Sequence, residues 1–275
     1  MYALRISAGN MTAAVFSAWR YYRMLPDSIL PDEELTDLCI SQQWKVLQKT
    51  QGFRFSIDAV LLAHFIQPAA RHRVLDLGTG SGVIPHLIAA RNPGVQIDAM
   101  ELQPEIADMA RRSVAYNQLT EQIQIIEQDI TRMPKEYQQQ YDWVTSNPPF
   151  FPVGTGKQNP NPQIALARHE IACTLDQLVQ SAAYCLKSRG HFALIHRAER
   201  LTDILSCCMK HKLAPYRLRM VHPALDQPAN LLLLEAIKDG KNGITVLPPL
   251  PIYRNIAKIT SDKSTYSDEV LTYYR

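Results

Sequence analysis

A glycine-rich turn between a short apolar segment and a helical pattern constrains the fold of this chain most. Residues 74–77 predict a buried strand that carries one acid, Asp76. Residues 83–91 have the pattern of a helix, and the turn between the two segments consists of Gly78, Thr79, Gly80, Ser81 and Gly82. A strand, a glycine turn and a helix in this order are typical of the first unit of an open α/β sheet. Glycine at such a turn lets a ligand approach the backbone.

The same alternation continues along most of the chain. Further strands are predicted at residues 95–100, 123–126, 141–146, 191–196, 217–221 and 230–237, and helices at residues 57–65, 104–117, 174–187 and 199–211. Ser56 and Thr174 are the expected N-caps of the first and third of these helices. Alternating elements with short connections predict a Rossmann-like, doubly wound α/β sheet of seven strands, mostly parallel. Residues 223–228 are too few for a crossover helix, so the last strand should run antiparallel.

The other segments surround one α/β domain, which we assign to residues 71–240. Residues 1–24 contain arginine but no acid, and we expect a weakly ordered basic extension there. Residues 25–70 are expected to form an N-terminal arm, with a small β-hairpin followed by the first helix. Residues 241–275 are expected to be a short C-terminal tail.

Composition narrows the class of protein. The chain has five cysteines but no C-x-x-C pair, which indicates reduced thiols in a cytoplasmic protein and no metal site. No apolar run approaches the ~18 residues of a membrane span, so we expect no membrane partner. The net charge of +3 permits a nucleic-acid partner without requiring one. The oligomeric state stays open between monomer and dimer.

Acids associated with the first three strands indicate the cofactor. The turn lacks the G-x-G-x-x-G spacing of dinucleotide-binding enzymes, and Asp76 just before it would repel a phosphate but attract an ammonium group. Glu101 follows the turn by about twenty residues, where a carboxylate can accept both hydroxyls of a ribose. Asp129 follows the third strand and could accept from an adenine amino group. An amine, a ribose and an adenine in this order describe S-adenosylmethionine. Phe53 is a further candidate neighbour of this cofactor.

A second motif follows the predicted strand at residues 141–146. It reads Asn147, Pro148, Pro149 and Phe150, and places an amide on a rigid turn at the C-terminal end of a strand. Ligands bind at that end of the strands in open α/β sheets. The Asn147 oxygen and the Pro148 carbonyl could accept from both hydrogens of a flat amine, and Phe150 could stack on its ring. We therefore predict that these four residues form the catalytic turn, with Asn147 also beside the cofactor.

With these motifs, the chain resembles the class I S-adenosylmethionine-dependent methyltransferases. The Asn-Pro-Pro-Phe turn resembles the signature of those that methylate a planar nitrogen. Residues 51–63, residues 76–85 and residues 167–170 resemble the bacterial tRNA adenine-N6 methyltransferases, which act beside the anticodon of a valine tRNA. The resemblance covers residues 35–253 and implies transfer of a methyl group to the N6 of an adenine in a tRNA anticodon loop.

Three alternative functions stay open. Phe150 stands where this family usually has tyrosine, and phenylalanine is common in the guanine-N2 methyltransferases. A protein glutamine N5 methyltransferase is a further alternative, although only a short arm precedes the domain here. A non-catalytic, cofactor-binding scaffold is the last, and it would tolerate loss of the Asn-Pro-Pro turn.

Two groups of basic residues are candidates for contacts to the RNA. Lys49 and Arg54 lie in the N-terminal arm, interleaved with aromatic residues. Lys157, Arg168 and His169 lie in the long segment 151–171, which has the length and composition of a flap over the substrate. Contacts from such residues to phosphates would make the affinity for RNA fall steeply with salt.

Overall fold

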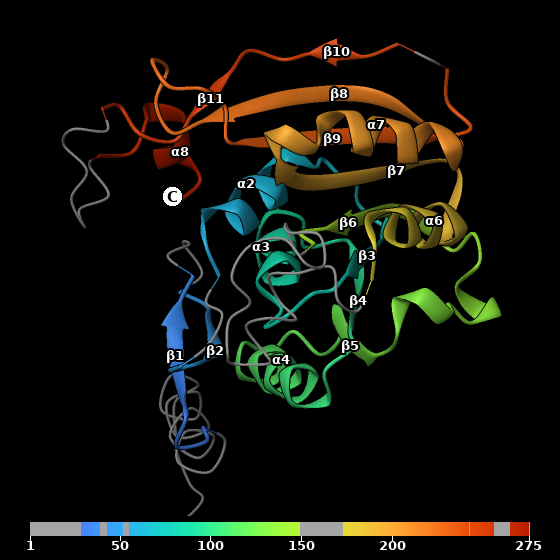
Figure 1. The fold of residues 1–275 in the computed structure, drawn as a ribbon. Helices are drawn as coiled ribbons and strands as arrows, with labels where there is room; N and C mark the ends of the chain where they lie inside the picture. Colours follow the sequence, from blue (N-terminus) through green and yellow to red (C-terminus); the bar gives the residue numbers. More distant parts are fainter. Residues whose placement is uncertain are drawn as a thin grey trace, which may run out of the picture.

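A nine-stranded sheet forms the centre of the structure, a computed structural model that describes residues 29–38, 43–51, 55–148, 173–241, 243–255 and 265–274. The long strands are β3 (Arg73–Leu77), β4 (Gln96–Glu101), β5 (Ile123–Glu127), β6 (Tyr141–Ser146), β7 (Leu186–Arg197), β8 (Leu213–His222) and β9 (Leu231–Lys238). They lie in the order β8-β9-β7-β6-β3-β4-β5 (Figure 1). Strand β9 is antiparallel to both of its neighbours, whereas β7, β6, β3, β4 and β5 pair in parallel. The predicted doubly wound sheet and its antiparallel last strand are therefore confirmed.

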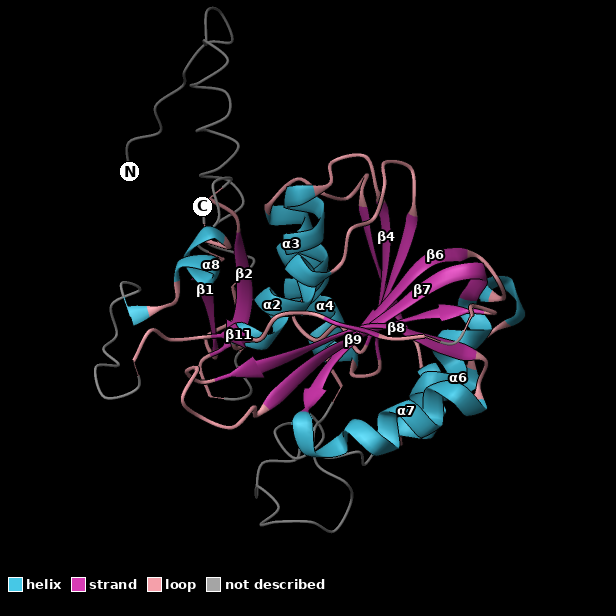
Figure 2. Ribbon diagram, turned by 90° about the horizontal axis from the view of Figure 1, so that it is seen from above, coloured by secondary structure: helices cyan, strands magenta, loops and turns pink. Residues whose placement is uncertain are grey.

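Helices cover both faces of this sheet (Figure 2). On one face lie α2 (Ile57–Phe65), α3 (Val83–Arg91) and α4 (Pro104–Tyr116), and on the other lie α6 (Leu175–Cys185) and α7 (Leu201–Lys210). Neighbouring strand residues belong to different cores: Val74 packs on the first face and Leu75 on the second. This division follows from the two-residue repeat of a strand, and it explains why the central strands are apolar at nearly every position.

The capping predictions have different outcomes. Thr174 caps α6 through a reciprocal pair of hydrogen bonds with Gln177, a capping box. Ser56 occupies the N-cap position of α2, but its side chain makes no capping hydrogen bond. Pro104 opens α4, where its missing N–H costs no intrahelical hydrogen bond.

The connection from α6 to β7 differs from the prediction. The helix ends at Cys185 rather than at residue 187, and β7 begins at once with Leu186, which pairs with Tyr141. The register then shifts, with Arg189 in the left-handed region at a φ of 67°. A Cβ on Gly190 would lie 2.9 Å from the Lys187 carbonyl oxygen, so this bulge requires glycine. The residues predicted to close the helix therefore form an irregular start of the strand.

A two-stranded hairpin lies apart from the main sheet (Figure 1). It consists of β1 (Glu33–Asp37) and β2 (Lys45–Lys49), which pair antiparallel and confirm the hairpin predicted in the arm. It packs on α4: the Leu47 N–H donates to Ser113 Oγ at 2.9 Å, and the Lys45 N–H donates to Asn117 Oδ1 at 3.1 Å. These hydrogen bonds attach β2 to α4.

The described part of residues 241–275 adds regular elements to the sheet. The two-residue strands β10 (Thr245–Val246) and β11 (Leu250–Pro251), which the sequence patterns do not predict, pair in parallel with β8. Helix α8 (Asp268–Thr272) follows, and Tyr273 just after it stacks on His64 of α2 with ring centroids 4.4 Å apart. Short 3-10 turns complete the described elements: η1 (Ile130–Arg132), η2 (Lys135–Tyr137) and η3 (Ala198–Arg200). In the ranges that the structure describes, no helix is both long and apolar enough to span a membrane.

Candidate active site

The glycine turn lies at the C-terminal edge of the sheet, between β3 and α3. Gly78, Gly80 and Gly82 have φ angles of 72°, 57° and 82°, in the left-handed region that favours glycine. The N–H groups of Gly78 and Thr79 both donate to the Met100 carbonyl at 2.9 Å, which attaches the turn to β4. A Cβ added at Gly78 or Gly80 would meet no atom within 4 Å. The backbone of this turn is therefore open on one side, as a turn that holds a ligand must be.

Asp76 lies beneath this turn and is fully buried. Its Oδ1 accepts a hydrogen bond from Thr145 Oγ1 at 2.8 Å, whereas Oδ2 has no hydrogen-bond partner among the described residues. Burial raises the pKa of Asp76 to about 7, and the nearby charge of Glu101 acts in the same direction. A buried acceptor without a donor fits the ammonium group of S-adenosylmethionine, as the sequence predicts.

Glu101 ends β4 and is held by two backbone groups. Its Oε2 accepts from the Gly80 N–H and its Oε1 from the Gln103 N–H, both at 2.9 Å. Each carboxylate oxygen has further acceptor capacity after one hydrogen bond, so the two hydroxyls of a ribose can still be bound. Glu101 is 6% exposed, and burial raises its pKa. The site thus contains two buried acids on neighbouring strands.

Asp129 differs from these two acids. Its Oδ1 accepts from the Thr131 N–H at 2.9 Å and from Thr131 Oγ1 at 2.7 Å, so that it caps η1. These hydrogen bonds lower the pKa of Asp129, and about a third of its side chain is exposed. Its contact with an adenine amino group stays a prediction.

The predicted catalytic turn begins where β6 ends. Asn147 and Pro148 are described, whereas Pro149 and Phe150 lie outside the described residues. Just before them, Ser146 Oγ donates to the Leu77 carbonyl at 2.8 Å, which joins the end of β6 to the end of β3. The amide Nδ2 of Asn147 faces Asp58 Oδ2 at 3.5 Å. Asp58 lies in the 51–63 segment, and no sequence motif predicts a separate role for it.

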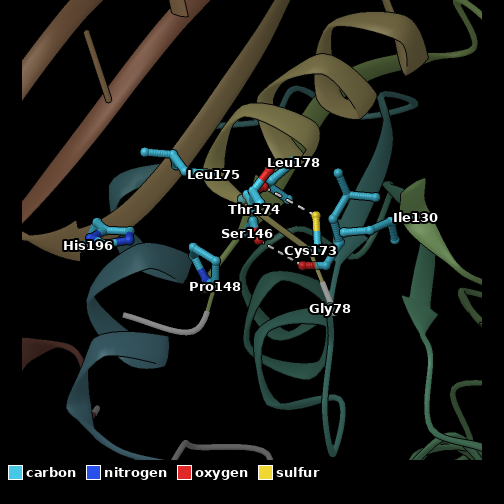
Figure 3. A pocket seen from close by; sticks show the side chains of 10 residues that line it. Gly78, Ile130, Ser146, Pro148, Cys173, Thr174, Leu175, Leu178 and His196 are labelled. Atoms are coloured by element: carbon cyan, nitrogen blue, oxygen red, sulfur yellow. Dashed lines mark hydrogen bonds between the residues drawn. The ribbon is translucent and has the colours of Figure 1, made fainter. Parts of the chain in front are cut away.

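One pocket connects the two predicted motifs (Figure 3). Its empty volume is about 380 Å³, part of which is open to solvent. Its lining residues are Leu77, Gly78, Ile130, Ser146, Pro148, Cys173, Thr174, Leu175, Leu178 and His196. Gly78 comes from the glycine turn and Pro148 from the Asn-Pro-Pro turn, so the pocket brings the two motifs together. Most of the other walls are apolar, which suits a flat ring.

His196 is a pocket residue that sequence reasoning misses. It ends a buried strand segment, where a histidine gives no signal that separates a site from a core. Its Nδ1 accepts from the Arg197 N–H at 2.8 Å, so the neutral ring carries its hydrogen on Nε2. Burial lowers the pKa of His196 to about 4, and the ring is therefore uncharged at neutral pH.

Of the candidate RNA contacts, only Lys49 lies in the described part of the chain. Arg54, Lys157, Arg168 and His169 fall outside the described residues, as does Phe53, the candidate neighbour of the cofactor. Lys49 is described: its ammonium group lies 2.9 Å from Asp32 and 3.4 Å from Glu33, and its side chain is only 12% exposed. Its charge is thus neutralised within the hairpin, and its contact with RNA stays a prediction. The described ranges contain no group of three or more metal-ligating side chains.

The comparisons with known proteins agree with this geometry. The family model of the methyltransferase small domain matches residues 55–213, which include both turns. The chain belongs to the methyltransferase small domain family. One relative within the family is the tRNA1(Val) (adenine(37)-N6)-methyltransferase of Porphyromonas gingivalis, 30% identical over 207 residues that make up 73% of this chain and 80% of the relative. A protein of the same name from Yersinia pestis is 33% identical over 155 residues, 56% of this chain and 62% of that relative.

A solved structure has a fold similar to that of this chain. The crystal structure of a predicted O-methyltransferase from Agrobacterium tumefaciens matches 79% of this chain and 95% of its own, with a TM-score of 0.62 and 22% identity. The family model and the relatives confirm the predicted family, the enzyme class and S-adenosylmethionine as the cofactor.

Proposed function

We propose that this chain transfers a methyl group from S-adenosylmethionine to N6 of the adenine at position 37 of a valine tRNA. The observation that carries the proposal is the pocket shared by the two motifs, with Gly78 on one wall and Pro148 on another. The substrate is taken from the names of the relatives from P. gingivalis and Y. pestis. Position 37 lies beside the anticodon in a single-stranded loop, the usual place for sequence-specific reading of RNA.

Three acids hold the methyl donor in this proposal. Asp76 binds its ammonium group, Glu101 its ribose hydroxyls and Asp129 its adenine amino group. The open backbone of Gly78 and Gly80 allows it to lie against the turn. S-adenosylmethionine, when bound, supplies an electrophilic methyl group on a positively charged sulfur.

In this proposal the Asn-Pro-Pro turn activates the amine nitrogen that receives the methyl group. An aromatic amine is a poor nucleophile because its lone pair is delocalised into the ring. Asn147 Oδ1 and the Pro148 carbonyl accept from its two hydrogens and direct the lone pair toward the methyl group. With S-adenosylmethionine bound, the new N–C bond would replace the S–C bond, whose electron pair would stay on sulfur, and the surplus proton would leave the nitrogen for water. Prolines carry no N–H, so no backbone donor competes at this place.

The target base must leave its stack to reach the pocket. An unpaired loop base costs less to extrude than a paired one. The apolar walls formed by Ile130, Leu175 and Leu178 shield the reacting groups from water. Stacking of Phe150 on the base would add ~1–3 kcal/mol.

The guanine-N2 alternative rests on Phe150. In guanine the N2 amine lies between N1–H and N3, whereas in adenine N6 lies beside N1, an acceptor. The two bases thus present the same amine with different neighbours, and the product distinguishes them directly.

The experiment measures that product. The protein is incubated with unmodified bulk tRNA and labelled S-adenosylmethionine, and the labelled nucleoside is identified by mass spectrometry. We expect N6-methyladenosine in the valine tRNA, and no labelling of a matched transcript that carries guanine at position 37. N2-methylguanosine would replace the proposal by the guanine alternative, and tRNA without label would overturn the proposal.

A further inference from the structure

The proposed mechanism leaves one buried acid, Asp58, without a role. It lies in the first turn of α2, within the 51–63 segment, and is 5% exposed. The other buried residues of this helix are apolar: Ala59, Val60, Leu61, Leu62, Ala63 and Phe65. An ionised carboxylate in such surroundings is costly unless it has specific partners. The position therefore requires an explanation beyond packing.

Stabilisation of its own helix explains only part of this position. An acid in the first turn interacts favourably with the N–H groups there, and the N–H groups of Asp58 and Ala59 do lower the pKa that burial raises. Water-exposed acids give a helix the same benefit without the cost of burial. In addition, Asp58 Oδ1 is buried without a hydrogen-bond partner among the described residues. The carboxylate is thus held in place for something other than α2.

The remaining neighbour is Asn147. Its Nδ2 lies 3.5 Å from Asp58 Oδ2, although the two residues are 89 positions apart in the chain. This separation is long for a hydrogen bond, and such contacts often shorten when substrate binds. A carboxylate can only accept, so it attracts the NH2 end of the amide and repels its oxygen.

We propose that Asp58 is a positioning residue, whose carboxylate fixes the orientation of the Asn147 amide so that Oδ1 points to the substrate amine. An amide has two orientations that differ only in which end carries the donor, and only one of them serves as an acceptor for the amine. The charge of Asp58 also polarises the amide and makes Oδ1 a stronger acceptor. This inference rests on the proposed function, because it assigns Asn147 Oδ1 to the substrate. It also gives the 51–63 segment a role in the site.

The test compares two substitutions at position 58 under saturating tRNA and S-adenosylmethionine. In Asp58→Ala no acceptor remains, and we expect kcat to fall at least ~10-fold. In Asp58→Asn the new amide can present either end, so kcat should lie between the wild type and Asp58→Ala. The calorimetric Kd for S-adenosylmethionine and the KM for tRNA should stay within about threefold of wild type, because the proposal gives Asp58 no contact with either ligand. Asp268→Ala is the matched control: it removes one of the two first-turn acids of α8, whose side chain is 92% exposed, and should leave kcat unchanged.

A double mutant separates positioning from general stability. If Asp58 acts through Asn147, Asp58→Ala should cause no further loss of kcat in an Asn147→Ala background. The inference would be overturned if the two losses of kcat multiplied in the double mutant. It would also be overturned if both Asp58→Ala and Asp58→Asn kept the wild-type kcat. Should Asp58→Ala fail to fold, the nearly isosteric Asp58→Asn carries the test, and a wild-type kcat there overturns the inference as well. Failure of the proposed function looks different, because the wild-type enzyme would then label another base or another substrate.

Discussion

Glu101 Oε2 accepts a hydrogen bond from the Gly80 N–H at 2.9 Å, which ties the end of β4 to the glycine turn that follows β3. The second oxygen of the same carboxylate holds the Gln103 N–H, just before α4 begins. One side chain therefore holds both the glycine turn, against which the cofactor is proposed to lie, and the backbone just before α4.

This arrangement predicts that Glu101→Ala weakens cofactor binding more than its lost ribose contact alone would. Two partly buried N–H groups lose their acceptor, each at a cost toward the lower end of about 1–3 kcal/mol. We expect the calorimetric Kd for S-adenosylmethionine to rise at least ~10-fold, together with a lower thermal midpoint. Glu101→Gln keeps one acceptor oxygen and should lie between the alanine variant and wild type. A wild-type Kd in Glu101→Ala would remove Glu101 from the cofactor site.

The buried carboxyl of Asp76 predicts that cofactor affinity depends on pH. Its pKa is about 7 in the folded protein, against about 3.9 in an unfolded chain. The folded state holds this proton more tightly, so the protein without cofactor should lose stability as pH rises from about 4 to 7. A ligand ammonium favours the carboxylate, so binding below pH 7 should release a proton. The affinity for S-adenosylmethionine should then rise by up to ~10-fold per pH unit until about pH 7.

Calorimetry in buffers of different ionisation enthalpy measures the released proton directly. Asp76→Asn is the control, because it should bind more weakly and without this pH dependence. A wild-type affinity that stays flat between pH 5.5 and 7 would contradict an ammonium contact at Asp76.

Asn147 predicts a separation of binding from catalysis. Asn147→Ala should leave the affinity for S-adenosylmethionine nearly intact and lower methyl transfer ~100-fold or more, because the acceptor of the amine hydrogens is lost. Single-turnover rates and calorimetry on the same preparation provide the two numbers. Asn147→Asp, which keeps an acceptor oxygen, should retain more activity than the alanine variant. An unchanged rate of methyl transfer in Asn147→Ala would contradict the proposed mechanism.

The ion pair between Glu33 and Arg112 predicts local loosening of the hairpin. Both guanidinium NH2 groups lie 2.7 Å from Glu33 oxygens, and the Glu33 side chain is 1% exposed. Glu33→Ala should cost about 1–3 kcal/mol, below the usual figure for a buried pair because Arg112 is partly exposed. Amide hydrogen exchange in β1 and β2 should accelerate, with little change in β3–β6.

Asp108→Ala provides the control for this prediction. Asp108 binds the same guanidinium at 2.8 Å but is 58% exposed, so its removal should cost less than about 1 kcal/mol. Equal exchange rates in the two variants would show that the hairpin does not depend on the buried pair.

Local sequence patterns are sufficient to predict the elements whose ends are marked by capping residues, glycine or proline. Helix α2 occupies residues 57–65 and α3 residues 83–91, both as predicted. Ser56 and Pro68 flank the first helix, and Gly82 and Asn92 flank the second. Such residues act through their own backbone preferences, so a pattern reveals them. The antiparallel β9 follows from the length of a loop, which is also a local property.

Pairing between distant segments decides the elements that the patterns miss. β7 begins at Leu186 because Tyr141 on β6 offers it a partner, and β10 forms because the edge of β8 is open to residues 245–246. Residues 186–190 and residues 245–246 lack a strand pattern strong enough to be predicted alone, because the stability of each segment comes from the neighbouring strand.

The sequence by itself determined the order of the elements, the glycine turn with its acids, and the Asn-Pro-Pro turn, since each of these is a contiguous pattern. Only the tertiary structure decided which side chains meet at the site. It brought Asp58 to Asn147 and gave Gly78 and Pro148 a common pocket. It also left Asp76 buried, with one oxygen that has no hydrogen-bond partner in the described part of the chain. The physical reason is that such contacts join segments far apart in the chain, and their energies depend on burial, which arises only when the sheet and its helices pack together.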